Sequence, residues 1–194
     1  MSQLIRSQPA AAKLRALLRR NFLLYVGGRH AYKNFDRLLA AFHSARLNTD
    51  YDLLAVGGGP LTTGEAGIVA RLGLGNSVIC IPEAPDSLLA EAYAAATLFV
   101  YPSLSEGFGM PPLEAMSAGC PVATSRVTAI PEVCGDAPFY FDPADTGSIA
   151  NALTRAVSQE EERRTAIARG RAIAAGYRWE KCGAETLAVY RDCR

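Results

Sequence analysis

Short apolar runs alternate along the chain with longer segments whose apolar residues recur at helical spacing. The runs expected to form strands are 22–26, 51–56, 78–81, 98–101, 121–124 and 139–141. The segments expected to form helices are 34–46, 62–73, 86–96, 112–118, 145–157, 160–175 and 179–190. Continuously apolar strands are typical of a parallel sheet that is buried on both faces. The pattern therefore predicts an α/β fold: a Rossmann-like, doubly wound parallel sheet of about six strands with helices on both faces.

Polar stretches rich in glycine and proline follow most of the predicted strands. These stretches are 27–33, 57–60, 81–86, 102–112 and 125–132. In an open parallel sheet the carboxyl ends of the strands share one edge, and ligands bind outside that edge. The sequence therefore predicts one binding edge, built from these stretches.

Two carboxylates eight positions apart, Glu106 and Glu114, flank a glycine-rich turn and a proline pair between a strand and a helix. The start of a helix offers free backbone N–H groups to an anion. Carboxylates accept hydrogen bonds from hydroxyls. The pattern favours a ligand that carries both phosphate and hydroxyl groups, as a sugar nucleotide does. The alternative is an acid at a helix start plus an unrelated surface glutamate.

Two cations, Arg29 and Lys33, follow the first strand and lie four positions apart. Both side chains could neutralise a diphosphate, although two solvated surface cations remain an equal alternative. The run Gly57-Gly58-Gly59-Pro60 indicates either a tight turn or close approach of the backbone to a ligand. The histidines His30 and His43 have no metal-ligand spacing with cysteines or acids.

The chain has 194 residues and a net charge of +1, which gives no general argument for binding nucleic acid. The charge is uneven, because residues 1–20 hold five basic and no acidic residues. We expect a basic linker or N-terminal helix over 1–20 and a single domain over 21–194. Five cysteines without a disulfide pattern, no secretory segment and no membrane-spanning run predict a cytoplasmic protein. A peripheral position at the inner face of a membrane stays open for the basic leader.

On these residues the chain resembles the C-terminal, donor-binding half of a GT-B glycosyltransferase in the large retaining group known as family 4. The resemblance covers roughly residues 21–194. Its motifs are Tyr25-Val26-Gly27-Gly28-Arg29, Tyr32-Lys33-Asn34, Gly57-Gly58-Gly59-Pro60, Tyr101-Pro102-Ser103, Glu106-Gly107-Phe108-Gly109, Pro112-Leu113-Glu114-Ala115-Met116, Ile130-Pro131-Glu132-Val133 and Phe141-Asp142-Pro143. The two glutamates around the turn are its most specific signal.

The resemblance implies a role for each matched residue. Arg29 and Lys33 would neutralise the diphosphate of a UDP- or GDP-linked sugar, and Glu106 would hold the sugar hydroxyls. Glu114 would bind the ribose diol. The implied donor-binding set is Gly28, Gly57, Gly58, Ile81, Pro82, Gly107, Phe108, Gly109 and Glu114, with the base against Ile81 and Pro82. No metal is implied, because fixed cations and helix N-termini would stabilise the leaving diphosphate.

The resemblance implies a whole enzyme with two Rossmann-like domains, of which this sequence would contain one. The N-terminal domain, which would bind the glycan or lipid-linked acceptor, would then be missing, so we expect the chain to be inactive alone. It would be either a fragment or one half of a split enzyme whose other half is a separate chain. Two other functions remain open: a non-catalytic support half of a split transferase, and a GT-B-like sugar-nucleotide epimerase.

Overall fold

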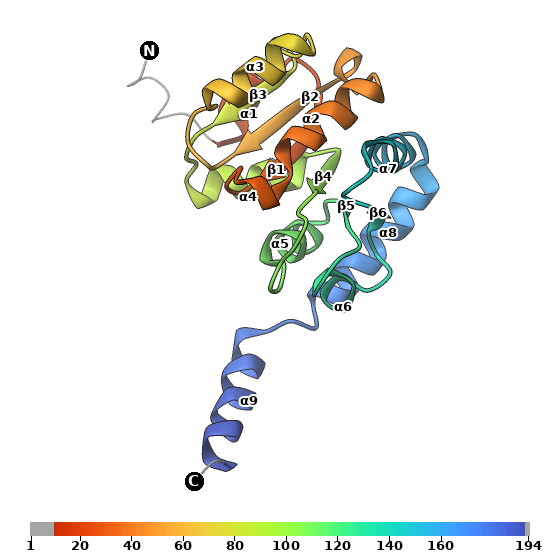
Figure 1. The fold of residues 1–194 in the computed structure, drawn as a ribbon. Coiled ribbons are helices and arrows are strands. Elements are labelled where there is room, and N and C mark those ends of the chain that lie inside the picture. Colours follow the sequence, from red (N-terminus) through yellow and green to blue (C-terminus); the bar gives the residue numbers. More distant parts are fainter. Residues whose placement is uncertain (1–9, 193–194) are drawn as a thin grey trace.

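The structure, a computed structural model, describes residues 10–192. It confirms the predicted doubly wound sheet: six strands lie in the order β3-β2-β1-β4-β5-β6, and every neighbouring pair is parallel (Figure 1). The strands are β1 Asn21–Val26, β2 Tyr51–Val56, β3 Val78–Ile81, β4 Leu98–Tyr101, β5 Val122–Ser125 and β6 Phe139–Phe141. The order reverses between β1 and β4, which makes these two strands the switch point of the sheet.

Helices cover both faces of the sheet. The helices of this part of the chain are α1 Ala10–Leu17, α2 Phe35–Ser44, α3 Thr63–Arg71, α4 Asp86–Ala95, α5 Met110–Ala118, α6 Ile130–Cys134, α7 Thr146–Ser158, α8 Glu160–Ala174 and α9 Trp179–Asp192, with short 3-10 turns at Ala31–Lys33 and Leu47–Thr49. Helix α6 was not expected from the sequence, since its five residues are too few to show a helical period.

Two apolar layers result from the alternation of side chains along the strands. On one face Leu23 and Tyr25 of β1 join the apolar sides of α2, α3 and α7. On the other face Phe22 and Leu24 join α1, α4, α5 and α6. Burial on both faces explains why the strands have continuous apolar runs.

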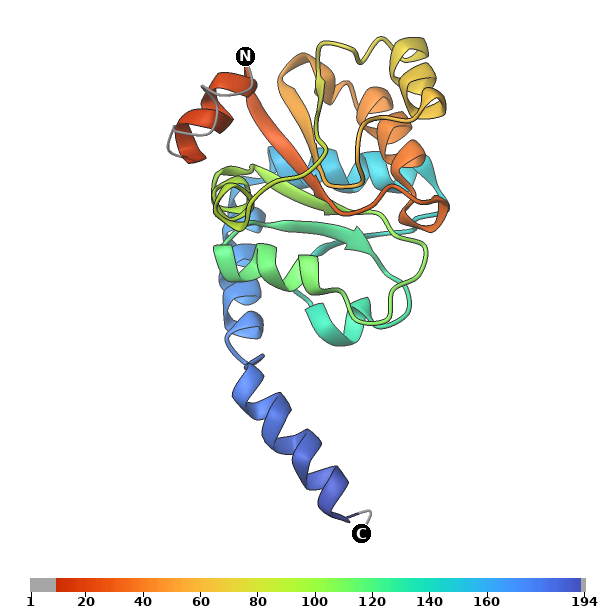
Figure 2. The same ribbon diagram turned by 90° about the vertical axis from the view of Figure 1, so that its left-hand side faces the viewer.

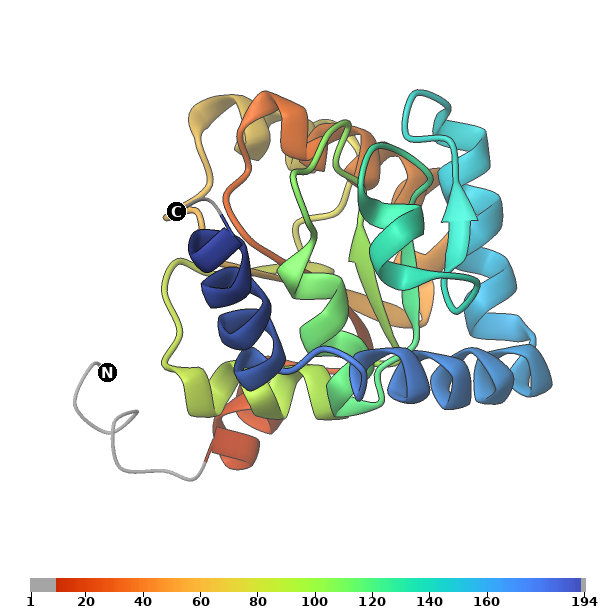
Figure 3. The same ribbon diagram turned by 90° about the horizontal axis from the view of Figure 1, so that it is seen from below.

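The two ends of the described chain behave differently. Helix α1 packs against α4 and buries Leu14, which is 3% exposed, and the segment after it is held by Arg20 on the buried carboxylate of Asp52. Helix α9 stands away from the rest of the molecule (Figures 1 and 2), and its Trp179 and Tyr190 are more than two-thirds exposed. Figure 3, seen from below, brings α9 to the front of the molecule.

Candidate functional site

The loops after β1 and β4 meet at the switch point through an ion pair. Lys33 Nζ lies 2.7 Å from Glu106 Oε1 and donates a second hydrogen bond of 3.1 Å to the Tyr101 hydroxyl. The ammonium also lies 5.2 Å from the ring centroid of Tyr32 and 5.1 Å from that of Tyr101. Lys33 and Glu106 are both mostly buried, at 15% and 12% side-chain exposure. The structure thus brings together Lys33 and Glu106, two of the three residues predicted to contact the diphosphate or the sugar.

Asn34 fixes the position of Lys33. Its backbone adopts the left-handed conformation, with φ of 60°, and ends the turn that carries Lys33. Its buried amide donates to the carbonyls of Pro102 and Pro143, at 3.0 and 2.8 Å. Asparagine tolerates this conformation better than most residues, and its side chain ties the β1 loop to the loops after β4 and β6.

Glu106 is ionised in this setting. Burial alone would raise the pKa of its carboxyl, but hydrogen bonds, led by that from Lys33, outweigh burial and lower it. Burial raises the pKa of Tyr101 to about 12, so its hydroxyl keeps its proton at neutral pH. The site therefore presents a carboxylate, an ammonium and a neutral hydroxyl on two adjacent loops.

Backbone N–H groups next to Glu106 are unused. In the part of the chain that the structure describes, the amides of Gly107, Phe108 and Gly109 donate to no backbone or side-chain acceptor, whereas the Glu106 amide donates to Thr128 Oγ1. These three residues precede α5, and the helix dipole places partial positive charge at the N-terminus of that helix. Gly109 has φ of 105°, and a Cβ there would lie 2.6 Å from Ile130 Cδ1. The positive φ therefore favours glycine at this turn.

Glu114 lies on α5 and is exposed. Its Oε2 accepts a 3.0 Å hydrogen bond from the Tyr93 hydroxyl of α4. Burial, and then the charge of Glu114, raise the pKa of Tyr93, so this hydroxyl remains a donor. One carboxylate oxygen is thereby oriented, and the other is available to a ligand.

Arg29 has partners that the sequence did not indicate. Its Nε donates to Glu65 Oε1 at 2.8 Å, and its Nη atoms donate to the carbonyls of Gly57, Gly59 and Pro60. Its side chain is 3% exposed. Direct contact between Arg29 and a diphosphate would break these bonds, so that role stays a prediction.

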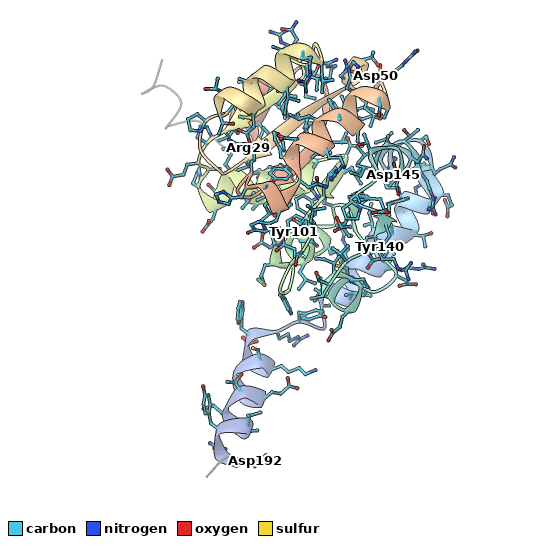
Figure 4. All side chains as sticks on the ribbon, viewed as in Figure 1. Arg29, Asp50, Tyr101, Tyr140, Asp145 and Asp192 are labelled. Carbon is cyan, nitrogen blue, oxygen red and sulfur yellow. The ribbon has the colours of Figure 1, made fainter. Side chains whose placement is uncertain are left out.

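The predicted base-binding edge adjoins the same loop. The Gly57 amide donates to the Ile81 carbonyl at 2.9 Å, and the Gly59 amide to the Pro82 carbonyl at 3.4 Å. Gly28 lies across from Gly58, since a Cβ on Gly58 would approach Gly28 Cα to 3.2 Å. In Figure 4 Arg29 and Tyr101 lie in the same region of the molecule, whereas Asp192 marks the far end of α9.

Apolar side chains are exposed around this edge. Tyr32, Leu104, Phe108 and Met110 are each more than 40% exposed. A groove of about 890 Å³ runs from Phe108 and Glu114 along α5 to the start of α9.

Comparison with known proteins decides the family. The model of the glycosyl transferases group 1 family matches residues 8–173. The chain belongs to the glycosyl transferases group 1 family. O-antigen chain mannosyltransferase B from Escherichia coli is 37% identical over 173 residues, which cover 88% of this chain and 45% of that protein. The group 1 chain thus spans less than half the length of this relative.

Solved structures agree with the GT-B fold of the family. Sucrose-phosphate synthase from Thermosynechococcus elongatus matches with a TM-score of 0.82 and 29% identity, over 95% of this chain and 48% of that one. WaaG, a glycosyltransferase involved in lipopolysaccharide biosynthesis, matches with a TM-score of 0.75 and 26% identity, over 86% of this chain and 46% of that one. None of the helices described in this group 1 chain combines the length and hydrophobicity needed to cross a bilayer.

Three contributors to the site were not singled out as functional residues from the sequence: Glu65, Tyr93 and Thr128. Glu65 had a signal, because Thr62 and Glu65 have the spacing of a capping box, and the structure contains both of its hydrogen bonds. Tyr93 and Thr128 had no such signal in the sequence. Their contacts depend on how α4 and the β5 loop pack against this edge.

Proposed function

We propose that this chain is the donor-binding half of a retaining glycosyltransferase and that it binds a nucleotide-diphosphate sugar at the carboxyl edge of the sheet. The observation that carries the proposal is the Lys33–Glu106 pair beside the free amides of residues 107–109. A cation and unpaired N–H groups suit a diphosphate, and an adjacent carboxylate suits sugar hydroxyls.

The proposed roles follow from the geometry. Lys33 exchanges part of its contact with Glu106 for the donor diphosphate, and the amides before α5 bind the same group. During transfer the bond from the anomeric carbon to the diphosphate oxygen breaks, and its electron pair leaves with the diphosphate. The acceptor hydroxyl oxygen bonds to that carbon, and its proton passes to the departing diphosphate oxygen. Lys33 and the α5 dipole stabilise the charge that develops on the leaving group.

The carboxylates hold the donor in this proposal. Glu106, freed in part from Lys33, accepts hydrogen bonds from the sugar hydroxyls. Glu114, with one oxygen oriented by Tyr93, accepts from the ribose diol. The name of the Escherichia coli relative favours a mannose-bearing donor.

A second domain completes the enzyme in this proposal and binds a glycan or lipid-linked acceptor. The chain spans less than half of its relative. The exposed rim of Tyr32, Leu104, Phe108 and Met110, and the exposed side chains of α9, are the surfaces that this domain would cover. The chain alone would then bind donor without transferring the sugar.

Thermal denaturation tests the proposal with UDP, GDP and ADP and with UDP-glucose and GDP-mannose, each at millimolar concentration. A ligand that binds the folded state raises Tm by a few degrees. Lys33→Ala is expected to abolish the shift for every diphosphate, and Glu106→Ala only the extra shift of the sugar-bearing ligands. Arg164→Ala and Glu161→Ala, both at exposed positions on α8, are the matched controls.

Two other outcomes would support the alternative functions. No shift with any nucleotide, together with a tightly bound partner protein, would support a non-catalytic support half. Epimer formation from a nucleotide sugar, once the second domain is supplied, would support an epimerase.

A further inference from the structure

The Arg29 guanidinium is held in a hydrogen-bond network with the Gly57–Pro60 loop and Glu65. Its Nη1 donates to the Gly57 carbonyl at 2.5 Å, and its Nη2 donates to the carbonyls of Gly59 and Pro60 at 2.9 and 2.7 Å. Its Nε faces Glu65. Arginine has five N–H donors, and this arrangement uses most of them on one loop.

Glu65 is held as firmly as Arg29. Its Oε2 accepts from the Thr62 amide at 2.7 Å, while its own amide donates to Thr62 Oγ1 at 3.2 Å. This capping box fixes the carboxylate at the start of α3. Burial would raise the pKa of Glu65, but the hydrogen bonds from Thr62 and Arg29 outweigh it and lower the pKa. The side chains of Arg29 and Glu65 are 3% and 8% exposed, so the pair is shielded from water.

The loop that Arg29 holds reaches the predicted base-binding edge. Gly57 and Gly59 donate to the carbonyls of Ile81 and Pro82. Arg29 also lies 5.6 Å from the centroid of the Phe35 ring, which anchors it to the start of α2. The network therefore joins the β1 loop, the β2 loop and the end of β3 into one unit.

We infer that Arg29 and Glu65 are positioning residues: they set the Gly57–Pro60 loop and, through it, the part of the edge that contacts the nucleoside. Lys33, whose ammonium faces Glu106 on the other side of the β1 loop, is the side chain that contacts the diphosphate. The inference rests on the proposed function for its ligand. It separates two cations that lie four positions apart in the sequence and gives them different tasks.

Titration calorimetry on the 194-residue chain tests this division of tasks with UDP, GDP and inorganic pyrophosphate. Glu65→Gln and Arg29→Lys are each expected to weaken the nucleoside diphosphate that binds wild type about tenfold. Glu65→Gln leaves a buried guanidinium without its counter-charge, and Arg29→Lys has too few donors to hold the loop carbonyls. Both variants should bind pyrophosphate within about twofold of wild type, given that Lys33 is intact. Lys33→Ala should weaken both ligands, and Glu161→Gln, at an 87% exposed side chain, should change neither.

One outcome of the calorimetry would contradict this division of tasks. If Glu65→Gln changes pyrophosphate affinity as much as nucleotide affinity, in either direction, Arg29 contacts the diphosphate directly and the inference is wrong.

Hydrogen exchange without ligand gives an independent measurement. The Gly57 and Gly59 amides should exchange several-fold faster in Glu65→Gln than in wild type or Glu161→Gln. Unchanged exchange would overturn the positioning role. If Glu65→Gln does not fold, Thr62→Ala, which loosens the cap and leaves the guanidinium untouched, should accelerate the same amides. If wild type binds neither nucleotide nor pyrophosphate, the proposed function fails, and the exchange result still decides the positioning role.

Discussion

Lys33 Nζ and Glu106 Oε1 lie 2.7 Å apart although 73 positions separate the two residues in the sequence. Their contact exists because β1 and β4 are neighbours at the switch point of the sheet. The pair therefore links the fold to the proposed donor site: strand order places a cation and a carboxylate where a diphosphate and a sugar would meet.

The pair predicts a pH dependence of stability. The folded pKa of Glu106 lies below its usual value of 4.5, so its contribution is present above that value and is lost as pH falls through the folded pKa. Burial would lower the pKa of Lys33, but hydrogen bonds to Glu106 and Tyr101 raise it above 10.5, so its contribution is lost only at higher pH. A double-mutant cycle with Lys33→Met and Glu106→Gln, measured by urea denaturation, should give a favourable coupling energy at about pH 7 that is smaller at an acid pH where Glu106 takes up a proton. Equal coupling at both pH values would contradict the ion pair.

Glu114 is expected to contact the ribose of the bound nucleotide. Glu114→Gln is expected to raise the Kd of the bound nucleoside diphosphate about tenfold, because an amide is a weaker acceptor for the diol than a carboxylate. Tyr93→Phe should have a smaller effect in the same direction, since it only releases one oxygen of Glu114. Titration with the 2′,3′-dideoxy nucleotide is the control, and its affinity should hardly respond to Glu114→Gln. An equal loss of affinity for both nucleotides would show that Glu114 does not contact the ribose diol.

Two adjacent glycines offer a matched pair for the Arg29 network. Gly58 and Gly59 have φ of 76° and 77°, so alanine should cost about 1 kcal/mol at either position. A Cβ on Gly58 would also lie 3.0 Å from Arg29 Nη1, whereas at Gly59 the space is open. We expect Gly58→Ala to lower the free energy of unfolding by about 1–2 kcal/mol more than Gly59→Ala. Equal losses in urea denaturation would show that the loop can move away from Arg29.

Asp52 anchors the segment before β1. It is fully buried and accepts hydrogen bonds from the Arg20 guanidinium and the Arg19 amide. Asp52→Asn is expected to lower the free energy of unfolding by about 3 kcal/mol, because it leaves a partly buried guanidinium without its counter-charge. Asp50→Asn, on the exposed turn two residues earlier, should change stability little. A similar small effect at both positions would mean that Arg20 finds other partners.

Much of this arrangement could be predicted from the sequence, and the remainder could not for identifiable reasons. Continuous apolar runs predicted the parallel sheet, and hence that Lys33 and Glu106 share an edge. Which loops touch depends on strand order, which local patterns do not contain. The Arg29–Glu65 bond shows the same limit: the spacing of Thr62 and Glu65 signals a cap, but the approach of the β1 loop to that cap is a tertiary contact.

The most direct test of donor binding is amide chemical-shift mapping by NMR, with UDP-glucose and GDP-mannose titrated into the 194-residue chain. We expect the largest shifts for residues 28–33 and 106–110, and none in the groove that Arg15 and Arg19 line between α1 and α4. Lys33→Ala should abolish these chemical-shift changes at a ligand concentration that saturates wild type. Absence of shifts with both ligands, or shifts centred on the α1 groove, would contradict the assignment of a nucleotide-sugar site to the Lys33–Glu106 edge.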